Sequence, residues 1–374
     1  MTFIGYTLSL RLLANVIVRH CPLGYLVPPI SLIISAYNER NVIARKLDNA
    51  LSLDYPKRLL EILVISDCSD DGTDEVVEGY ADRGIKLFRV PSRRGKSHGL
   101  THFVPQASGE IIVFTDANAI YEPTALRLLV RHFSDPQIGY VVGNQCYHTG
   151  TGTGAGNSEG AYTSHEERLK ILESRISSVV GGDGAIYAIR KQLFRPLRDD
   201  DISDFVNPLQ IVAAGYRGVY EPAARCFEEP AGEFGKEYRR KVRIVNRSLR
   251  GASRVPAVFN PFRVGWFAYQ IFFHKLMRWF APYFLAVMLA ANIARVAVAP
   301  NWLYSMTLAA QLTGYGVAAL YAVPGLRNHR IVQLAFYFVV VNAAAAVGTT
   351  LFLCGRRIVT WKPERTASTA KHTV

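Results

Sequence analysis

Cysteine is scarce in this sequence of 374 residues, and its spacing suits neither a zinc module nor a disulfide framework. The five cysteines lie far apart, without a Cys-x-x-Cys pair: Cys21, Cys68, Cys146, Cys226 and Cys354. The pattern therefore argues against a structural zinc site and against a secreted disulfide scaffold. A reducing, cytoplasmic setting fits it.

Charged residues are sparse in the last third of the chain. Three apolar runs there, about 281–299, 302–323 and 331–354, are each long enough to cross roughly 30 Å of hydrocarbon. Residues 28–255 instead mix charge, Gly and Pro as a water-soluble domain does. The sequence predicts a cytoplasmic soluble domain joined to a membrane domain of three spans over residues 281–355, which places the protein in the inner or plasma membrane.

Two further segments are predicted to touch the bilayer without forming one of these spans. Residues 256–280 are rich in aromatic and basic side chains, the composition of a helix that lies in the interface plane. Residues 1–27 hold a short apolar run interrupted by Arg11, and no small-residue cleavage site follows it. We expect a membrane-embedded or interfacial helix at this N-terminal segment, and a disordered basic tail at residues 356–374.

Acidic residues are fewer than basic ones, and the formal net charge of +13 predicts an anionic partner. Many Lys and Arg side chains fall within 236–254, directly before the apolar runs, which favours lipid headgroups over nucleic acid. The basic loop 327–330 is predicted to be cytoplasmic by the positive-inside rule. Counting three spans then places the tail outside, whereas its own basic residues favour the inside, and the sequence leaves this conflict open.

Short apolar runs alternate with stretches of helical spacing in the soluble domain. The runs that predict strands are Ile30–Ser35, Ile62–Ser66, Ile85–Val90, Ile111–Thr115 and Ala185–Ile189. This alternation predicts βαβ units and a mainly parallel sheet, in which a ligand binds at the carboxyl ends of the strands. Polar clusters follow three of those ends, at residues 36–39, 67–72 and 116–118.

These clusters contain residue types that bind metals and phosphates. Asp116 offers a hard oxygen ligand for Mg²⁺ or Mn²⁺, and Asn118 can add an amide oxygen from the same side of an extended chain. Taken alone, Asp116 could equally cap a helix. Lys96 follows a glycine and can approach a phosphate, although a solvated basic turn is the alternative.

An acidic run covers residues 199–204. We expect its first two members, Asp199 and Asp200, to lie in an exposed loop. Asp204 is followed by Phe205 and Val206, which predicts a more buried place and a pKa raised toward that of a useful base.

In their order along the chain, six blocks resemble the family-2 inverting glycosyltransferases with a GT-A fold. Within that family they are most similar to the membrane-bound branch that contains cellulose, hyaluronan and poly-N-acetylglucosamine synthases. The blocks are SLIISAYNER (31–40), VISDCSDDGTDE (64–75), Gly95-Lys96, IIVFTDAN (111–118), GDGAIYAIR (182–190) and Ile202-Ser203-Asp204. The resemblance covers roughly residues 28–255 and implies a Rossmann-like α/β sheet domain followed by transmembrane helices.

The resemblance also implies roles for particular side chains. It assigns the donor nucleotide, most often a uridine diphosphate sugar, to Tyr37, Glu39, Asp67, Lys96 and Asp116. It assigns a metal ion, Mg²⁺ or Mn²⁺, to Asp116 and Asn118. It makes Asp204 the general base. It assigns the diphosphate and the acceptor channel to Asp183, Arg240 and Arg243.

The sequence departs from the family pattern at three positions. Asn118 stands where the family has the second carboxylate of Asp-x-Asp, which should weaken metal affinity. Ser203 replaces the usual Glu before the base. Ile244 stands in place of the Trp that would stack on an acceptor sugar, so the pattern supports sugar transfer more firmly than processive polymer synthesis.

The implied function is a metal-assisted single displacement that moves a sugar from a nucleotide donor to a saccharide acceptor, with inversion. Two alternatives stay open. One is a non-processive transferase that adds one sugar to a lipid-linked acceptor, and the other is a membrane scaffold that binds a nucleotide without chemistry. Because three spans are few for a polymer channel, an oligomer or an export partner is a further expectation, whereas nucleic acid is not an expected partner.

Overall fold

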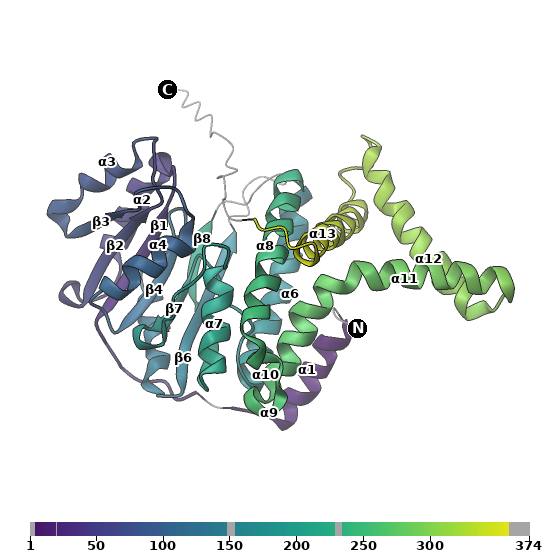
Figure 1. Ribbon diagram of the computed structural model, residues 1–374, viewed down its shortest axis with the longest axis horizontal. Coiled ribbons are helices and arrows are strands. Elements are labelled where there is room, and N and C mark those ends of the chain that lie inside the picture. The colour runs from purple at the N-terminus through teal and green to yellow at the C-terminus, as the bar shows by residue number, and fades with distance from the viewer. Residues whose placement is uncertain (1–3, 20, 148–153, 229–233, 359–374) are drawn as a thin grey trace.

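A mixed α/β sheet of eight strands forms the centre of the computed structural model (Figure 1). The structure describes residues 4–19, 21–147, 154–228 and 234–358. In spatial order the strands run β3-β2-β1-β4-β7-β6-β8-β5. Their bounds are β1 Ile30–Ala36, β2 Leu60–Ser66, β3 Ile85–Arg89, β4 Ile111–Asp116, β5 Ile120–Tyr121, β6 Ile138–Tyr147, β7 Tyr187–Arg190 and β8 Arg217–Glu228.

Four neighbouring strands, β3-β2-β1-β4, form a parallel half of the sheet, as the sequence predicts. β1 lies between β2 and β4 and runs parallel to both, so that Ile33 pairs with Leu63 on one side and with Phe114 on the other. All three side chains are fully buried, because helices cover both faces of the sheet and each strand there can be apolar throughout. β7 is the exception among the inner strands, since it runs antiparallel to both of its neighbours, β4 and β6.

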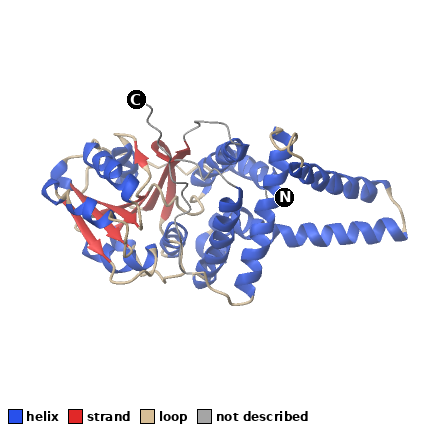
Figure 2. Cartoon of the chain, turned by 90° about the horizontal axis from the view of Figure 1, so that it is seen from above, coloured by secondary structure: helices blue, strands red, loops and turns tan. Residues whose placement is uncertain are grey.

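Helices pack on both faces of the sheet (Figure 2). On one face, Ile43 and Leu47 of α2 join a buried cluster with β1, whereas on the other face Leu100 of α4 and Leu209 of α7 join the second cluster. The helices of this domain are α2 Arg40–Ser52, α3 Thr73–Glu78, α4 Lys96–Phe103, α5 Ala125–Val130, α6 Gly154–Ile176, α7 Ser203–Ala213 and α8 Phe234–Arg254. This three-layer arrangement leaves the carboxyl ends of the parallel strands as the open edge of the sheet.

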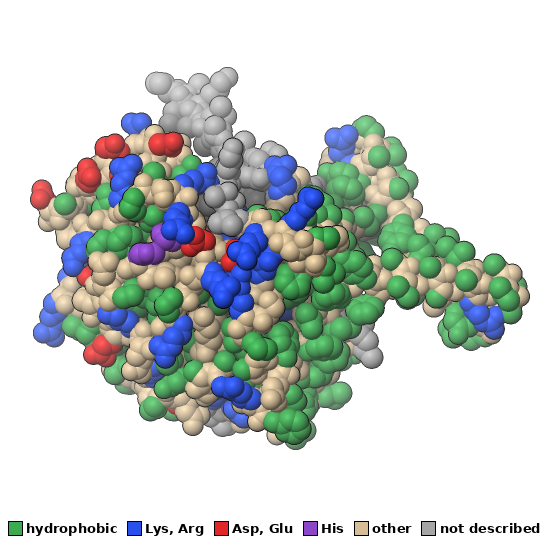
Figure 3. Space-filling view, in the orientation of Figure 1, with side chains coloured by type: hydrophobic (Ala, Val, Ile, Leu, Met, Phe, Trp, Pro, Cys, Tyr) green, Lys and Arg blue, Asp and Glu red, His purple; other side chains and the backbone are tan. Residues whose placement is uncertain are grey.

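The C-terminal helices extend away from the sheet, and α11 and α12 form a projecting arm covered with apolar side chains (Figures 1 and 3). The helices of this region are α9 Pro261–Val264, α10 Trp266–Ile271, a π-helical turn Phe272–Leu276, α11 Met277–Val298, α12 Trp302–Ala319 and α13 Arg330–Leu353. Within the described residues, two helical segments are long and apolar enough to cross a membrane by length and composition, Trp266–Val298 and Arg330–Leu353.

The C-terminal helices begin and end at other residues than the sequence predicts. The expected limit between an interfacial helix ending at residue 280 and a first span starting at 281 lies inside the continuous helix Trp266–Val298. The span expected at 302–323 corresponds to α12, an 18-residue helix that is not one of these two segments.

The N-terminal helix α1, Ile4–Val16, has 13 residues, fewer than the roughly 20 needed to cross a bilayer. One of its faces packs on the sheet domain, because Tyr6 and Leu10 are buried against Leu169 of α6. Its other face is apolar and open, with Leu12 and Val16 largely exposed. The helix therefore joins α6 while it presents an apolar surface outward.

The acidic run before α7 is not an exposed loop, so the expectation for Asp200 was wrong. Asp200 and Asp201 are 4% and 3% exposed, and both form ion pairs with Arg254 of α8. Arg247 donates to the main-chain carbonyls of all three residues 199–201. Buried carboxylates require such partners, so α8 fixes the backbone that leads into Asp204.

The chain leaves α13 beside the sheet domain. The main-chain carbonyl of Arg356 accepts hydrogen bonds from Asn246 (3.2 Å) and Arg250 (2.6 Å), both on α8. Gly348 lies so close to α8 that a Cβ on it would stand 2.8 Å from the Val242 carbonyl oxygen. The tail predicted to be disordered at 356–374 therefore starts against the sheet domain, and its residues from 359 onward lie outside the described residues.

Replacing Arg254 with Met should destabilise the fold, because two buried carboxylates would lose their cation. We expect a loss of about 3 kcal/mol in the free energy of unfolding, measured by chemical denaturation in detergent micelles. Arg250→Met is the matched control, since Arg250 donates to an exposed main-chain carbonyl instead. Equal losses in the two variants would contradict the assignment.

Candidate active site

The carboxyl ends of β1 and β2 carry the first polar cluster, and two residues there adopt unusual backbone angles. Asn38 has φ 53° and Cys68 has φ 61°, the left-handed region that side chains other than glycine rarely adopt. Asn38 compensates by bonding Asp70 twice, through its amide nitrogen (2.7 Å) and its amide oxygen (3.0 Å). Backbone strain of this kind is concentrated at functional sites, and here it marks the edge of the sheet that the sequence predicts.

Asp67, directly after β2, organises the loop that leads into α4. Its two carboxylate oxygens accept hydrogen bonds from the main-chain nitrogens of Arg94 (2.9 Å) and Gly95 (2.8 Å). Gly95 has φ 94°, so a residue with a side chain would be strained at this position. Asp67 thus holds the turn that delivers Lys96, the first residue of α4.

Lys96 and Asp116 form the central ion pair of the site, with 2.6 Å between Nζ and Oδ1. Lys96 also reaches the main-chain carbonyl of Gly184 at 3.4 Å. Burial alone would lower the pKa of Lys96, but the Asp116 carboxylate outweighs that cost and the pKa lies above its ordinary value. The ammonium therefore stays charged at neutral pH and compensates the carboxylates around it.

Asp204 stands beside this pair, at the start of α7. A Cβ built on Gly184 would lie 3.2 Å from Asp204 Oδ2 and 3.6 Å from Asp116 Oδ2, so both carboxylates face the same point. The Gly182 main-chain nitrogen donates to the Asp204 carbonyl at 2.5 Å, and glycine is needed there because a Cβ would meet that carbonyl oxygen at 2.7 Å. These close approaches set Asp204 against the loop that carries Asp183.

The pKa of Asp204 is raised from 3.8 to about 6. Burial is the largest cause, and the carboxylates of Asp183 and Asp116 add to it, while Lys96 opposes the shift. At neutral pH the group is a carboxylate that takes up a proton more readily than an exposed Asp. This is the property expected of a general base.

Two more carboxyl groups lie near the site, one predicted and one missed. Asp183 accepts from Lys170 (3.5 Å) and from the main-chain nitrogen of Ala185 (3.3 Å). Glu228, at the end of β8, was not singled out in the sequence, where two adjacent glutamates were the available signal. Burial, followed by Asp116 and Asp183, raises the pKa of Glu228 to about 8, and Gln145 donates to it at 2.5 Å.

The predicted nucleoside-binding side chains lie at the β1 end of the same edge. The Tyr37 ring stacks under the guanidinium of Arg93 at 3.9 Å, a cation–π contact. One terminal nitrogen of Arg93, Nη2, is buried without a hydrogen-bond partner among the described residues. Glu39 is 4% exposed and is the N-cap residue directly before α2. Arg93 is a second residue that the sequence interpretation missed, because an isolated basic turn is usually solvated.

Asn118 lies near Asp116, although not in the extended chain that we expected. The Ala119 main-chain nitrogen bonds the Asp116 carbonyl at 3.2 Å, so residues 116–119 form a turn. Within the described residues no three His, Cys, Asp or Glu side chains are arranged to hold a metal ion. The hard oxygens of Asp116 and Asn118 still fit Mg²⁺ or Mn²⁺ if a phosphate and water complete the coordination shell.

The two predicted arginines lie on α8. Arg240 pairs with Glu237 one turn earlier on the helix, with 2.8 Å between Nε and Oε2. The charge of Arg240 also lowers the pKa of Glu228, against the larger effects that raise it. Arg243 is half-buried one turn further along α8, and the neighbouring Ile244 is 37% exposed.

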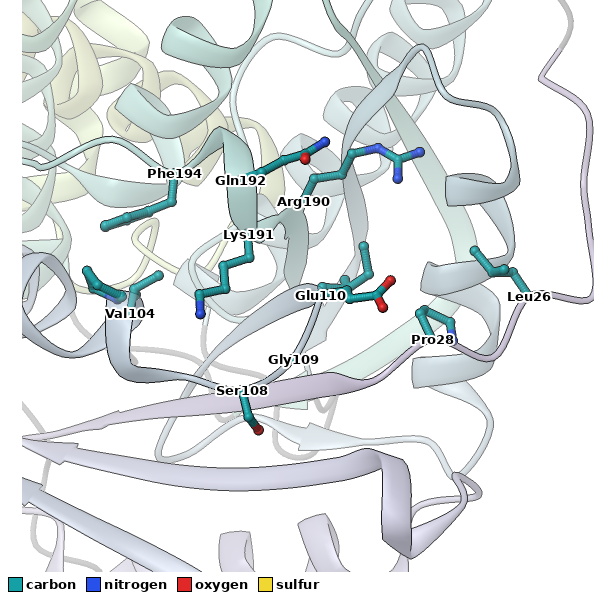
Figure 4. Close-up of a pocket in the computed structure, with 12 residues that line it drawn as sticks. Leu26, Pro28, Val104, Ser108, Gly109, Glu110, Arg190, Lys191, Gln192 and Phe194 are labelled. Atoms are coloured by element: carbon teal, nitrogen blue, oxygen red, sulfur yellow. The ribbon is translucent and has the colours of Figure 1, made fainter.

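A separate cavity of about 670 Å³ lies at the opposite edge of the sheet, at the amino ends of β1 and β4 (Figure 4). The basic side chains that line it already donate to main-chain oxygens. Lys191 donates to the carbonyl of Ala107, and Arg190 donates to three carbonyls of residues 133–138. The carboxyl edge, with its strained turns and perturbed carboxylates, is therefore the stronger candidate for the active site.

The fold and its carboxyl-edge site define a GT-A-like α/β domain. The family model for glycosyl transferase family 2 matches residues 31–195. A domain of the glycosyl transferase family 2 type thus covers this part of the chain, as its motifs indicate.

Three known proteins illustrate the similarity. Poly-beta-1,6-N-acetyl-D-glucosamine synthase from Staphylococcus epidermidis is 25% identical over 223 residues, which cover 58% of this chain and 54% of that protein. The synthase of the same name from Staphylococcus aureus is 26% identical over 220 residues, with 57% and 53% covered. The chain thus spans about half the length of these relatives. The mannosyltransferase PcManGT from Pyrobaculum calidifontis, solved in complex with GDP-Man and Mn²⁺, shares the fold with a TM-score of 0.68, 24% identity and 94% of each chain covered.

The raised pKa of Asp204 predicts a pH-dependent gain in stability on mutation. The folded state holds the proton up to about pH 6, whereas the unfolded chain releases it near pH 4, so the wild type loses stability as pH rises between these values. Asp204→Asn removes that loss and should be roughly 3 kcal/mol more stable at pH 8 than the wild type. The gain should vanish near pH 4. Thermal unfolding of both proteins at the two pH values measures it, and a gain of equal size at both would show that the buried charge is not its cause.

Proposed function

We propose that this protein is a membrane-bound inverting glycosyltransferase that moves a sugar from a nucleoside-diphosphate donor to a saccharide acceptor. The observation that carries the proposal is the grouping of Asp204, Asp116 and Lys96 at the carboxyl edge of the sheet. A carboxylate with a raised pKa beside an ammonium and a second carboxylate supplies a base, a phosphate ligand and a metal ligand in one place.

The donor nucleotide occupies the β1–β2 end of this edge. Tyr37, Glu39, Asp67 and Arg93 surround the nucleoside and its first phosphate, and Lys96 binds the diphosphate. UDP is our first choice of nucleotide, and GDP is the second, because the structurally similar mannosyltransferase was solved with GDP-Man. The poly-N-acetylglucosamine synthases point to an N-acetylhexosamine, and the mannosyltransferase to a hexose, as the transferred sugar.

Asp204 acts as the general base of a single displacement. It takes the proton from the acceptor hydroxyl as that oxygen attacks the anomeric carbon. The bond from the anomeric carbon to the diphosphate oxygen breaks at the same time, and the diphosphate leaves with the electron pair. Lys96, with Arg240 and Arg243 beyond it, stabilises the charge that develops on the diphosphate. Attack from the face opposite the leaving group inverts the configuration.

Asp116 and Asn118 would hold a divalent cation, Mg²⁺ or Mn²⁺, together with oxygens of the diphosphate. The bound ion would neutralise charge on the leaving diphosphate. Lys96 pairs with Asp116 in this structure, and its ammonium would bind a phosphate of the donor if a cation bound Asp116 instead. The neutral amide of Asn118 predicts a weaker hold on the ion than two carboxylates would give.

A lipid-linked acceptor is the second candidate for the transfer. Ile244 is 37% exposed where the family has an acceptor-stacking Trp, so this chain has lost that contact with a growing polysaccharide. A single transfer to a lipid-linked sugar needs no such contact. The length of the products made from labelled donor separates one addition from a polymer.

The apolar helices anchor the enzyme in the inner or plasma membrane, with its catalytic domain in the cytoplasm. Trp266–Val298 and Arg330–Leu353 are the segments proposed to enter the bilayer, and α1 adds an apolar face. An oligomer or an export partner would be required only for polymer release.

Turnover should depend on Asp204 in two ways. Asp204→Asn should lower kcat by ~10²–10⁴ while the donor still binds, because only the base is lost. In the wild type, kcat/KM should fall as pH drops through about 6, where Asp204 takes up its proton. Both are measured by release of free nucleoside diphosphate from a panel of UDP and GDP sugars with Mn²⁺. Wild-type turnover in the variant would rule out this base.

Removal of the metal should abolish this turnover, and the donor nucleotide should then bind more weakly. EDTA treatment followed by titration with Mg²⁺ or Mn²⁺ measures the effect, and calcium serves as a control because it is a larger ion that favours more ligands than the site offers. Full activity in EDTA would contradict the role of Asp116 and Asn118 as metal ligands.

A further inference from the structure

Lys46, on α2, is fully buried although no step of the proposed transfer uses it. Its ammonium donates to the hydroxyl of Thr115 (2.9 Å) and to the main-chain carbonyl of Ala119, and it lies 4.2 Å from the centre of the Tyr121 ring. Burial lowers the pKa of Lys46 to about 7 from 10.5, which shows how costly the site is for a charged group. Burying a lysine here costs free energy, yet a hydroxyl, a carbonyl and an aromatic ring are arranged around it. This arrangement requires an explanation.

The partners of Lys46 lie on either side of one short segment. Thr115 precedes Asp116, and Ala119 follows Asn118, so the ammonium links the two ends of the turn that carries the proposed metal ligands. The same helix braces the next residues, because Asn49 and Tyr121 exchange two hydrogen bonds of 2.9 Å. The turn is thus held from the α2 side of the sheet, opposite the ion pair that Asp116 forms with Lys96.

We propose that Lys46 is a positioning residue that holds the Asp116–Asn118 turn in the shape that binds the diphosphate and metal ion of the donor. This role rests on the proposed function, since it names what fixes the donor site. It matters more in this chain than it would with two carboxylates in the turn. The neutral Asn118 would bind the ion more weakly than a carboxylate would. The affinity for the ion therefore depends more on the exact position of Asp116.

Lys46→Met tests the proposal, with Lys191→Met as the matched control. Each substitution removes a lysine that bonds a main-chain carbonyl at one end of the sheet, but Lys191 lies at the opposite edge, beside the cavity of Figure 4. Two readouts are needed: the dissociation constant of UDP or GDP with Mn²⁺ by calorimetry, and amide hydrogen exchange of residues 116–121 without ligand. We expect Lys46→Met to weaken nucleotide binding at least tenfold and to speed exchange in the turn. Lys191→Met should change nucleotide binding less than twofold and leave exchange in the turn as in the wild type.

The exchange readout keeps the two proposals separate. If the wild type binds neither nucleotide, the proposed function fails, whereas exchange in the turn still decides whether Lys46 positions it. Unchanged exchange in Lys46→Met, or nucleotide binding equal to that of Lys191→Met, would overturn the role of Lys46. Should Lys46→Met fail to fold, Thr115→Val removes one hydrogen-bond partner of Lys46 and retains the lysine. That variant should weaken binding about threefold, and wild-type binding would count against the proposal.

Discussion

The site depends on several carboxylates held close together at the carboxyl ends of the parallel strands. The ammonium of Lys96 lies among them. Burial and the carboxylates of Asp183 and Asp116 raise the pKa of Asp204, and Lys96, which is bonded to Asp116, opposes that shift. Glu228 shares the same environment and therefore has a pKa of about 8. Like charges gathered in this way are unfavourable in an empty site and favourable once a cation and a donor arrive.

The rest of the fold keeps this unfavourable arrangement in place. Glycines at 182 and 184 let the loop before β7 approach Asp204 more closely than any larger residue would allow. On the other side, α8 clamps the backbone before Asp204 through Arg247 and Arg254, and α8 itself packs along α13, one of the two segments apolar enough for a membrane. Asp204, the proposed base, is thus connected through α8 to α13, which is proposed to enter the bilayer. The position of the base therefore depends on helices that also attach the protein to the membrane.

Much of this architecture could be predicted from the residues. The apolar runs of β1, β2 and β4 sit between helices of regular spacing, so the parallel half of the sheet and its polar carboxyl edge followed from periodicity. β5, β6 and β8 were not predicted, because long-range pairing rather than local pattern decides where they form. The boundary expected at residue 280 disappeared since the aromatic, basic segment continues directly into α11 as one helix.

The candidate site was predictable to a similar extent. Asp116 follows a predicted strand and Lys96 follows a glycine, both of which the sequence singles out, and the structure brings the two residues into contact. Asp200 was misjudged because its cation, Arg254, lies more than fifty residues away on another helix. Lys46 and Glu228 were missed for the same reason, since what makes each unusual is its burial, and burial depends on tertiary packing.

The most direct test is an experimental structure of the protein with Mn²⁺ and UDP or GDP. We expect the diphosphate within hydrogen-bond distance of Lys96, the ion on Asp116, and Asp204 open toward the acceptor side. A nucleotide bound instead in the cavity beside Lys191, at the opposite edge of the sheet, would contradict the proposed active site.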